Sequence, residues 1–150
     1  MRKTTFTLIT LTLFSFASVA KEKKQISSTV LQTTMGKLSY SDKGLHLETN
    51  ENCPSSVATG EAVWAVVLQN LADNTKEVVI SSNGNVPEIM AMPNGFRLSY
   101  PSLVLDGKTW NVGLDLDFSV QEEAFQISGT IRNQISDWVV MKFIGPVVNR

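Results

Sequence analysis

The chain contains few of the residues that most often build metal centres and disulfide frameworks. Its 150 residues include one cysteine, Cys53, and one histidine, His46. A single residue of each kind excludes zinc sites made of three histidines, four cysteines, or two of each, and it excludes a disulfide within the chain. We therefore expect neither a metal ion nor any other cofactor.

An excess of either charge is also missing. The chain has 13 Lys and Arg against 14 Asp and Glu, a formal net charge of −1. This balance excludes a nucleic-acid-binding protein that depends on overall basic charge. With 43% hydrophobic and 18% charged residues, the composition is that of one folded domain and not of a disordered chain.

Local catalytic motifs are absent from the sequence as well. It has no phosphate-binding glycine loop, no Gly-x-Ser-x-Gly turn, no His-Glu-x-x-His and no Cys-x-x-Cys. We therefore expect a protein that is not an enzyme. A small hydrolase with a site assembled from distant strands is a less favoured alternative, because local motifs do not reveal such a site.

The first 20 residues have the three parts of a secretory signal peptide. Arg2 and Lys3 form a basic start, an apolar run extends from Phe6 to Phe16, and Ser18-Val19-Ala20 supplies small residues before a cleavage point. The apolar run is shorter than the roughly 20 residues of a transmembrane helix. We expect cleavage after Ala20.

Removal of this leader defines the expected mature protein. Residues 1–20 are the signal peptide and residues 21–150 form a single all-β domain, with no membrane span in the mature chain. Loss of two basic residues moves the formal net charge from −1 to −3. We expect a periplasmic or secreted protein, in which Cys53 is inert, exposed in a polar loop, or bonded to another molecule.

Apolar residues of the mature chain recur with a period of two. Such alternation predicts strands with one buried and one solvated face. The inward positions of two neighbouring strands are expected at Leu114, Leu116, Phe118, Val120, Phe125, Ile127 and Ile131.

Two segments are apolar without interruption, residues 62–68 and 138–144. Both are candidates for central strands that are covered on both faces, and Trp64 is expected in the core. The segment Val86–Met92 is a candidate for a short helix.

Turn residues separate these strands at short intervals. Hairpins are predicted around Ala72-Asp73-Asn74-Thr75, Asp106-Gly107 and Gln121-Glu122-Glu123. About eight or nine strands with such spacing predict an all-β fold. The expected architecture is an antiparallel β-sandwich, immunoglobulin-like or similar, or a small barrel.

Four acidic residues are predicted to lie near one another. Asp115 and Asp117 share one strand face, and Glu122 and Glu123 follow in the adjoining turn. This group is either a solvated face or an acidic docking patch, since a glycosidase pair needs a cleft and a calcium site needs closely looped oxygen ligands.

Two tryptophans are further candidates for contact with a partner. Trp110 and Trp138 are expected at strand ends, where an aromatic side chain either caps the core or anchors an interface. His46 is expected at a solvated strand position. The candidate partner-binding residues are therefore Asp115, Asp117, Glu122, Glu123, Trp110 and Trp138.

These observations favour an exported, non-catalytic binding protein of the inhibitor or immunity type that docks on a protein partner. The alternative is a structural or accessory subunit of a surface or secretion assembly that uses strand addition. Strand addition predicts an unpaired, long, apolar sheet edge and assembly that depends on concentration, whereas an inhibitor predicts a monomer or dimer that binds one dominant target. A homodimer is possible, and no nucleic-acid partner is expected.

Overall fold

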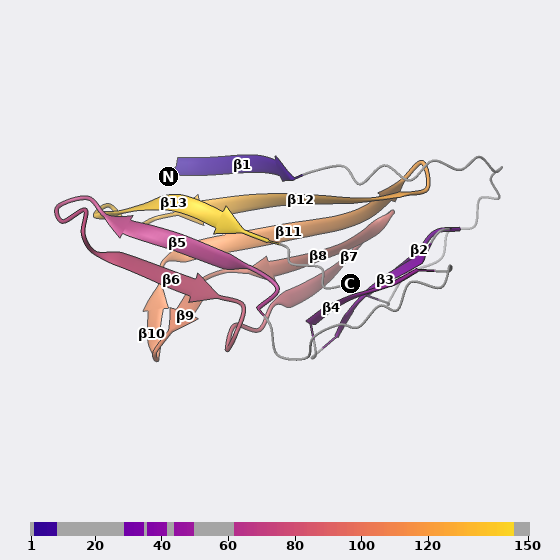
Figure 1. Ribbon diagram of the computed structural model, residues 1–150, viewed down its shortest axis with the longest axis horizontal. Helices are drawn as coiled ribbons and strands as arrows, with labels where there is room; N and C mark the ends of the chain where they lie inside the picture. The colour runs from indigo at the N-terminus through magenta and orange to yellow at the C-terminus, as the bar shows by residue number, and fades with distance from the viewer. Residues whose placement is uncertain (1, 9–28, 35, 42–43, 50–61, 146–150) are drawn as a thin grey trace.

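The computed structural model describes residues 2–8, 29–34, 36–41, 44–49 and 62–145. These residues form thirteen β-strands and no helix (Figure 1). The strands make several antiparallel sheets, and none of these sheets closes on itself. The all-β prediction is thus confirmed. Within the described ranges, no helix is long and apolar enough to cross a membrane.

The largest sheet has five strands and runs along the long axis of the molecule (Figure 1). Its central hairpin pairs Val112 with Asn133 at one end and Gln121 with Ala124 at the other. The order of strands is β1 (Arg2–Leu8), β12 (Ala124–Asn133), β11 (Val112–Gln121), β8 (Gly95–Tyr100) and β7 (Glu88–Met92).

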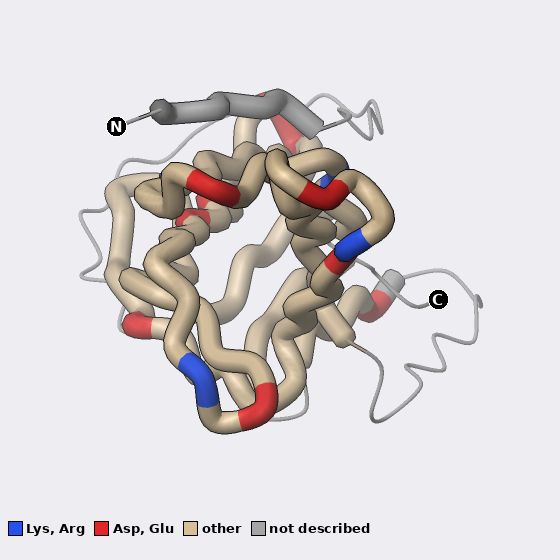
Figure 2. The backbone as a smooth tube through the Cα atoms, turned by 90° about the vertical axis from the view of Figure 1, so that its left-hand side faces the viewer, with Lys and Arg blue, Asp and Glu red and all other residues tan. Residues whose placement is uncertain are grey.

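There are two three-stranded sheets, of which one lies in front of these long strands in Figure 1 and the other at their lower right. One consists of β13 (Trp138–Ile144), β5 (Ala65–Asn70) and β6 (Glu77–Ser81), and the other of β2 (Val30–Gln32), β3 (Gly36–Ser41) and β4 (Gly44–Thr49). A short hairpin joins β9 (Leu103–Leu105) to β10 (Lys108–Trp110). Seen end-on, the strands surround a common interior (Figure 2).

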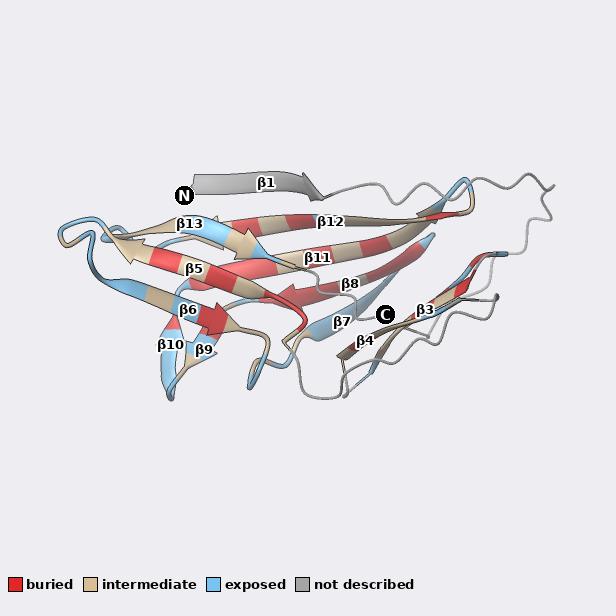
Figure 3. Cartoon of the chain, in the orientation of Figure 1, coloured by how far each residue is buried: buried red, intermediate tan, exposed pale blue. Residues whose placement is uncertain are grey.

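One hydrophobic core fills this interior. Residues of the large sheet and of both three-stranded sheets contribute to it. Phe96 and Phe118 stack with ring centroids 4.9 Å apart, and Trp64 meets Tyr100 edge to face at 4.9 Å. Buried positions alternate along β11 (Figure 3), because successive side chains of a strand point to opposite faces. The predicted burial of Trp64 and Phe118 is confirmed, and Phe125 is partly buried against the same core.

The three predicted hairpins are present. Asp106 and Gly107 have φ of 50° and 73° between β9 and β10, and Glu122 and Glu123 have φ of 49° and 64° between β11 and β12. Aspartate and glycine tolerate this left-handed region better than glutamate does. The turn between β11 and β12 is therefore held by contacts beyond its own residues.

The predicted helix over Val86–Met92 is wrong, because Glu88–Met92 is strand β7. It pairs with β8 in a continuous register, from Glu88 opposite Ser99 to Met92 opposite Gly95. Glutamate, methionine and alanine favour helices in isolation, but this propensity is weak and pairing with a neighbouring strand overrides it.

The prediction for residues 62–68 and 138–144 is correct in part for the first segment and wrong for the second. β5 lies in the middle of its sheet, but only one of its faces is buried, at Val66 and Leu68. β13 lies at the edge, and no residue of it is fully buried. An apolar run alone does not distinguish a central strand from an edge strand, because both have one face on the core.

Part of the predicted leader is described, and it forms strand β1. Residues Arg2–Leu8 pair with β12 from Asn133 to Ile127. The predicted cleavage point after Ala20 and the candidate thiol of Cys53 lie outside the described residues. Processing after Ala20 stays a prediction, and it would remove β1 from the sheet.

Candidate functional site

The outer face of the large sheet carries a row of paired charges. Arg97 on β8 donates to Asp117 on β11, with Nε–Oδ1 and Nη2–Oδ2 distances of 2.5 and 2.8 Å. Arg132 on β12 makes a two-pronged contact with Asp115, including an Nη2–Oδ1 distance of 3.0 Å. Each aspartate thus faces an arginine from a neighbouring strand, so the two carboxylates do not form an unopposed acidic surface.

The pair of Asp115 and Arg132 is the more enclosed of the two. Gly113 lies opposite Arg132, and a Cβ at Gly113 would come within 2.9 Å of Arg132 Nη2. The missing side chain thus lets the guanidinium lie against β11. Ser99 Oγ also donates to Asp115 at 2.7 Å. These contacts tie β8, β11 and β12 together across the sheet.

The electrostatic surroundings of Asp115 keep it ionised. Partial burial acts to raise the pKa of Asp115, but hydrogen bonds from Arg132 and Ser99 outweigh burial and hold it below its ordinary value. The hydrogen bond to Asp115 also raises the pKa of Arg132. A general acid or base works best with a pKa near the operating pH. This pair is therefore suited to holding the sheet and not to transferring protons.

Glu123 acts as a tether at one end of the molecule. Its Oε2 accepts hydrogen bonds from Thr34 N at 2.9 Å and from Thr34 Oγ1 at 3.0 Å. These bonds lower the pKa of Glu123. They connect the turn between β11 and β12 to the segment that follows β2, which explains how the positive φ of this glutamate is held. Glu122, beside it, is exposed.

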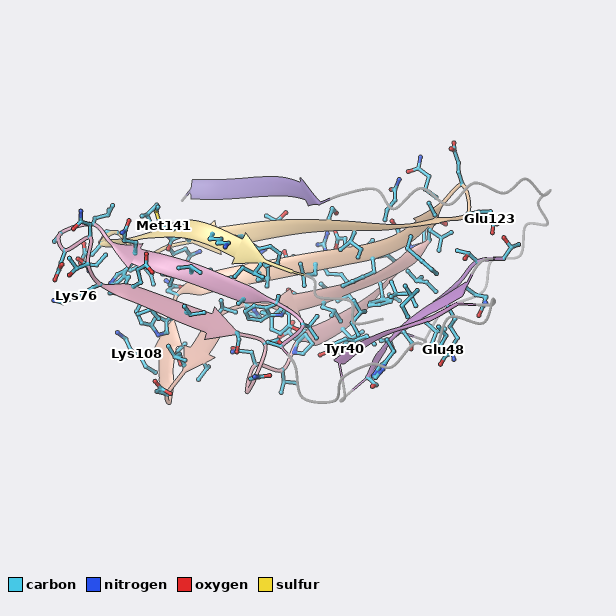
Figure 4. All side chains as sticks on the ribbon, viewed as in Figure 1. Tyr40, Glu48, Lys76, Lys108, Glu123 and Met141 are labelled. Carbon is cyan, nitrogen blue, oxygen red and sulfur yellow. The ribbon has the colours of Figure 1, made fainter. Side chains whose placement is uncertain are left out.

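The two candidate tryptophans lie together at the opposite end. Trp110 and Trp138 meet edge to face with ring centroids 5.1 Å apart, and Lys108 Nζ lies 4.2 Å from the centroid of Trp110. Trp110 is buried and Trp138 is half-buried. Lys108 and Glu123 mark the two ends in Figure 4.

The six predicted partner-binding residues are therefore divided among three places. Asp115 and Asp117 lie within the sheet face, Glu122 and Glu123 at one end, and the two tryptophans at the other. Charged positions are spread around the strands in the end-on view (Figure 2). A partner-binding role for these residues stays a prediction.

The single histidine lies on the hairpin of β3 and β4. His46 Nε2 is 3.3 Å from Ser41 Oγ, and both side chains are accessible. A serine nucleophile needs a base that a third group orients. Glu48 on the same strand instead contacts Lys37 at 3.4 Å. In the part of the chain that the structure describes, no cluster of three His, Cys, Asp or Glu residues is placed to hold a metal ion.

Of the strands of the large sheet whose side chains are described, β7 is the most exposed. Ile89 and Met90 are 52% and 41% exposed, and Figure 3 draws nearly the whole strand as exposed. Ile89 lies opposite buried Leu98, so it is on the core side of the sheet. Ile89 thus remains accessible although it is on the core side of the sheet.

The sheet of β13, β5 and β6 has two edge strands, β6 and β13, and both are protected. β9 lies against β6, and the Asn85 side chain holds the Val104 backbone with hydrogen bonds of 2.8 and 3.0 Å. On β13 the register shifts between Val140 and Lys142, which marks a β-bulge. Bulges, lysines and covering segments are the usual means by which proteins prevent pairing at a sheet edge.

Among the described residues, strand β7 has neither a bulge nor a lysine, and no strand pairs with its outer side. Its sequence, Glu-Ile-Met-Ala-Met, contains no lysine, arginine or proline, and its register with β8 runs without a shift. Sequence reasoning missed this edge because the segment was assigned to a helix. Pro87 and Pro93 enclose five residues, which is the length of a short strand, and they were the available signal.

Comparison of the chain with protein-family models, with curated protein sequences and with solved structures finds no match.

Proposed function

We propose that this chain is an exported, non-catalytic β-sandwich protein that binds a protein partner by strand addition along β7. The observation that carries the proposal is the exposure of β7, an apolar edge strand with Ile89 52% exposed on the core side of the sheet. A strand with unpaired backbone groups is a template for another strand.

The chemistry of β7 suits this mode of binding. An added strand would take main-chain hydrogen bonds from the free edge, and its alternate side chains would cover the apolar groups of Ile89 and Ala91. A subunit of a surface or secretion assembly works in this way. An inhibitor or immunity protein that binds through loops has no need of a bare edge, so the exposed edge favours the subunit.

The test compares two substitutions that place the same charge on different edge strands. Ile89→Lys puts an ammonium group on β7, and Val79→Lys puts one on β6, where the side chain is 53% exposed. Both variants should fold, because about half of each side chain is already exposed. Proteins retained from periplasmic and culture fractions by the wild type and by Val79→Lys should be lost with Ile89→Lys.

A second measurement locates the contact on the strand. Binding of the retained partner should slow amide hydrogen exchange in residues 88–92 and leave the exchange of β6 unchanged. Retention of the same partner by Ile89→Lys, or protection confined to the loops, would contradict the proposal.

A further inference from the structure

The large sheet has a second edge, and part of this chain already occupies it. Seven residues of β1, Arg2–Leu8, pair with Ile127–Asn133 of β12. Cleavage after Ala20 would expose this edge. We propose that in the processed protein this edge of β12 binds strand β7 of a second copy of the chain. This inference rests on the proposed function of β7 and names its partner.

The strand directions make β7 a suitable replacement for β1. β1 is antiparallel to β12, and each following pair in the sheet, β12 with β11, β11 with β8 and β8 with β7, is antiparallel as well. β7 therefore runs in the same direction as β1. A second copy shifted along the sheet, without being turned over, presents β7 to β12 in the antiparallel sense.

The pairing register is restricted by length and by the two faces of the sheet. The five residues of β7 fit within Ile127–Asn133 in three ways. Only one of them keeps Ile89 and Ala91 on the core side together with Ile131 and Gly129, because a shift by one residue turns every side chain to the other face. In this register Ile89 lies opposite Ile131, and Ala91 lies opposite Gly129.

The same register brings opposite charges together. It places Glu88, the one charged residue of β7, opposite Arg132. Opposite charges across a strand pair are favourable. The site on β12 thus fits β7 of a second copy in charge as well as in register.

This contact joins two different surfaces, so it does not close on itself. Each added copy leaves one β7 and one β12 edge free, which is the geometry of a growing row and not of a symmetric dimer. Residues 2–8 would then keep the precursor from assembling until it has been exported and cleaved.

The experiment mixes two proteins that each lack one of the two edges. The full-length chain with residues 1–20 retained has β12 covered and β7 free. The exported and processed Ile89→Lys variant has β12 free and β7 blocked. Each protein alone should sediment as a monomer in reducing buffer, and their mixture should form a one-to-one complex with the summed mass of the two chains. Processed wild type should form larger species as its concentration rises, and processed Val79→Lys should behave in the same way.

Three results would overturn the inference. They are an exported chain that still carries residues 1–20, a processed wild type that stays monomeric at all concentrations, and a mixture that forms no complex. Self-association of the full-length chain equal to that of the processed chain would indicate pairing of β7 with β7 instead. In each case, loss of another retained protein with Ile89→Lys would still support the proposed function of β7, so the two failures are distinguishable.

Discussion

Strands β7 and β13 are both edge strands with exposed methionine and isoleucine, but they differ in how the edge is protected. β13 contains a bulge at Met141 and an exposed Lys142. β7 has a regular register and no basic residue. Natural proteins protect edges that serve no purpose, since a bare edge promotes aggregation. This difference is the ground on which we propose β7, and not β13, as the binding edge.

The two strands also differ in what lies beneath them. Val140 and Phe143 of β13 pack against the hydrophobic core, so this strand contributes to folding. Ile89 of β7 lies on the core side but is 52% exposed. β7 is held mainly by its pairing with β8, and its side chains are available to a partner.

The largest expected effect concerns the core beside β7. Phe118→Ala should lower the free energy of unfolding by about 3–5 kcal/mol, because it leaves a cavity at a fully buried site that stacks on Phe96. Ile89→Ala should cost less than about 1 kcal/mol, since half of its side chain is already solvated. Urea unfolding of both variants measures the difference. Equal losses would mean that β7 is part of the core.

Removal of the lysine on β13 should make that edge resemble β7. In Lys142→Ile an exposed isoleucine becomes available for contact, and its burial in a new interface would contribute about 1.5–3 kcal/mol. Self-association should then be at least about tenfold tighter by sedimentation equilibrium, since about 1.4 kcal/mol corresponds to that factor. The control is Lys76→Ile, which changes an exposed turn residue outside any edge strand. Unchanged association of Lys142→Ile would show that the bulge alone protects β13.

The ion pair on the face of the large sheet should have a moderate effect on stability. Asp115→Asn should lower the free energy of unfolding by about 1–2 kcal/mol at neutral pH, because it leaves the Arg132 guanidinium, which is 22% exposed, without its carboxylate. The pKa of Asp115 is lowered from 3.8 on folding. Its contribution is therefore complete above that value and is lost as the pH falls through the folded pKa.

Measurement of unfolding as a function of pH tests this sign. Wild-type stability should fall more steeply in the acidic range than the stability of Asp115→Asn, and the two curves should converge at low pH. An equal acid dependence of the two proteins would contradict the assigned role of this carboxylate.

Much of the fold could be predicted from local sequence. The alternation around Leu116 and Phe118 predicted the central strands, and Asp106-Gly107 predicted the short hairpin of β9 and β10, because strand periodicity and turn conformation depend on near neighbours. The edge position of β13 was not predictable in this way. It depends on which strands pair across the sheet, and that pairing involves residues far apart in the chain.

The candidate site depends even more on distant pairing. The sequence placed Asp115 and Asp117 on one face, which is correct, but their cations come from β8 and β12. β7 was assigned to a helix because its residues favour one in isolation, and the pairing of Met92 with Gly95 and of Glu88 with Ser99 decides otherwise. Propensity reports local preference, whereas an exposed edge is a property of the assembled sheet.

The smallest expected effect concerns the charge at the start of β7. Glu88→Gln removes the group placed opposite Arg132 of the neighbouring copy, and exposed ion pairs contribute about 0.2–1 kcal/mol. Self-association of the processed protein should weaken by about two- to fivefold, since about 1.4 kcal/mol corresponds to tenfold. Glu77→Gln is a matched control, because Glu77 is the exposed first residue of β6. Added salt should weaken wild-type association and have less effect on Glu88→Gln, because salt screens the pair of charges. The same salt dependence in both proteins would show that Glu88 does not face Arg132, and the register along β12 would then have to be a different one.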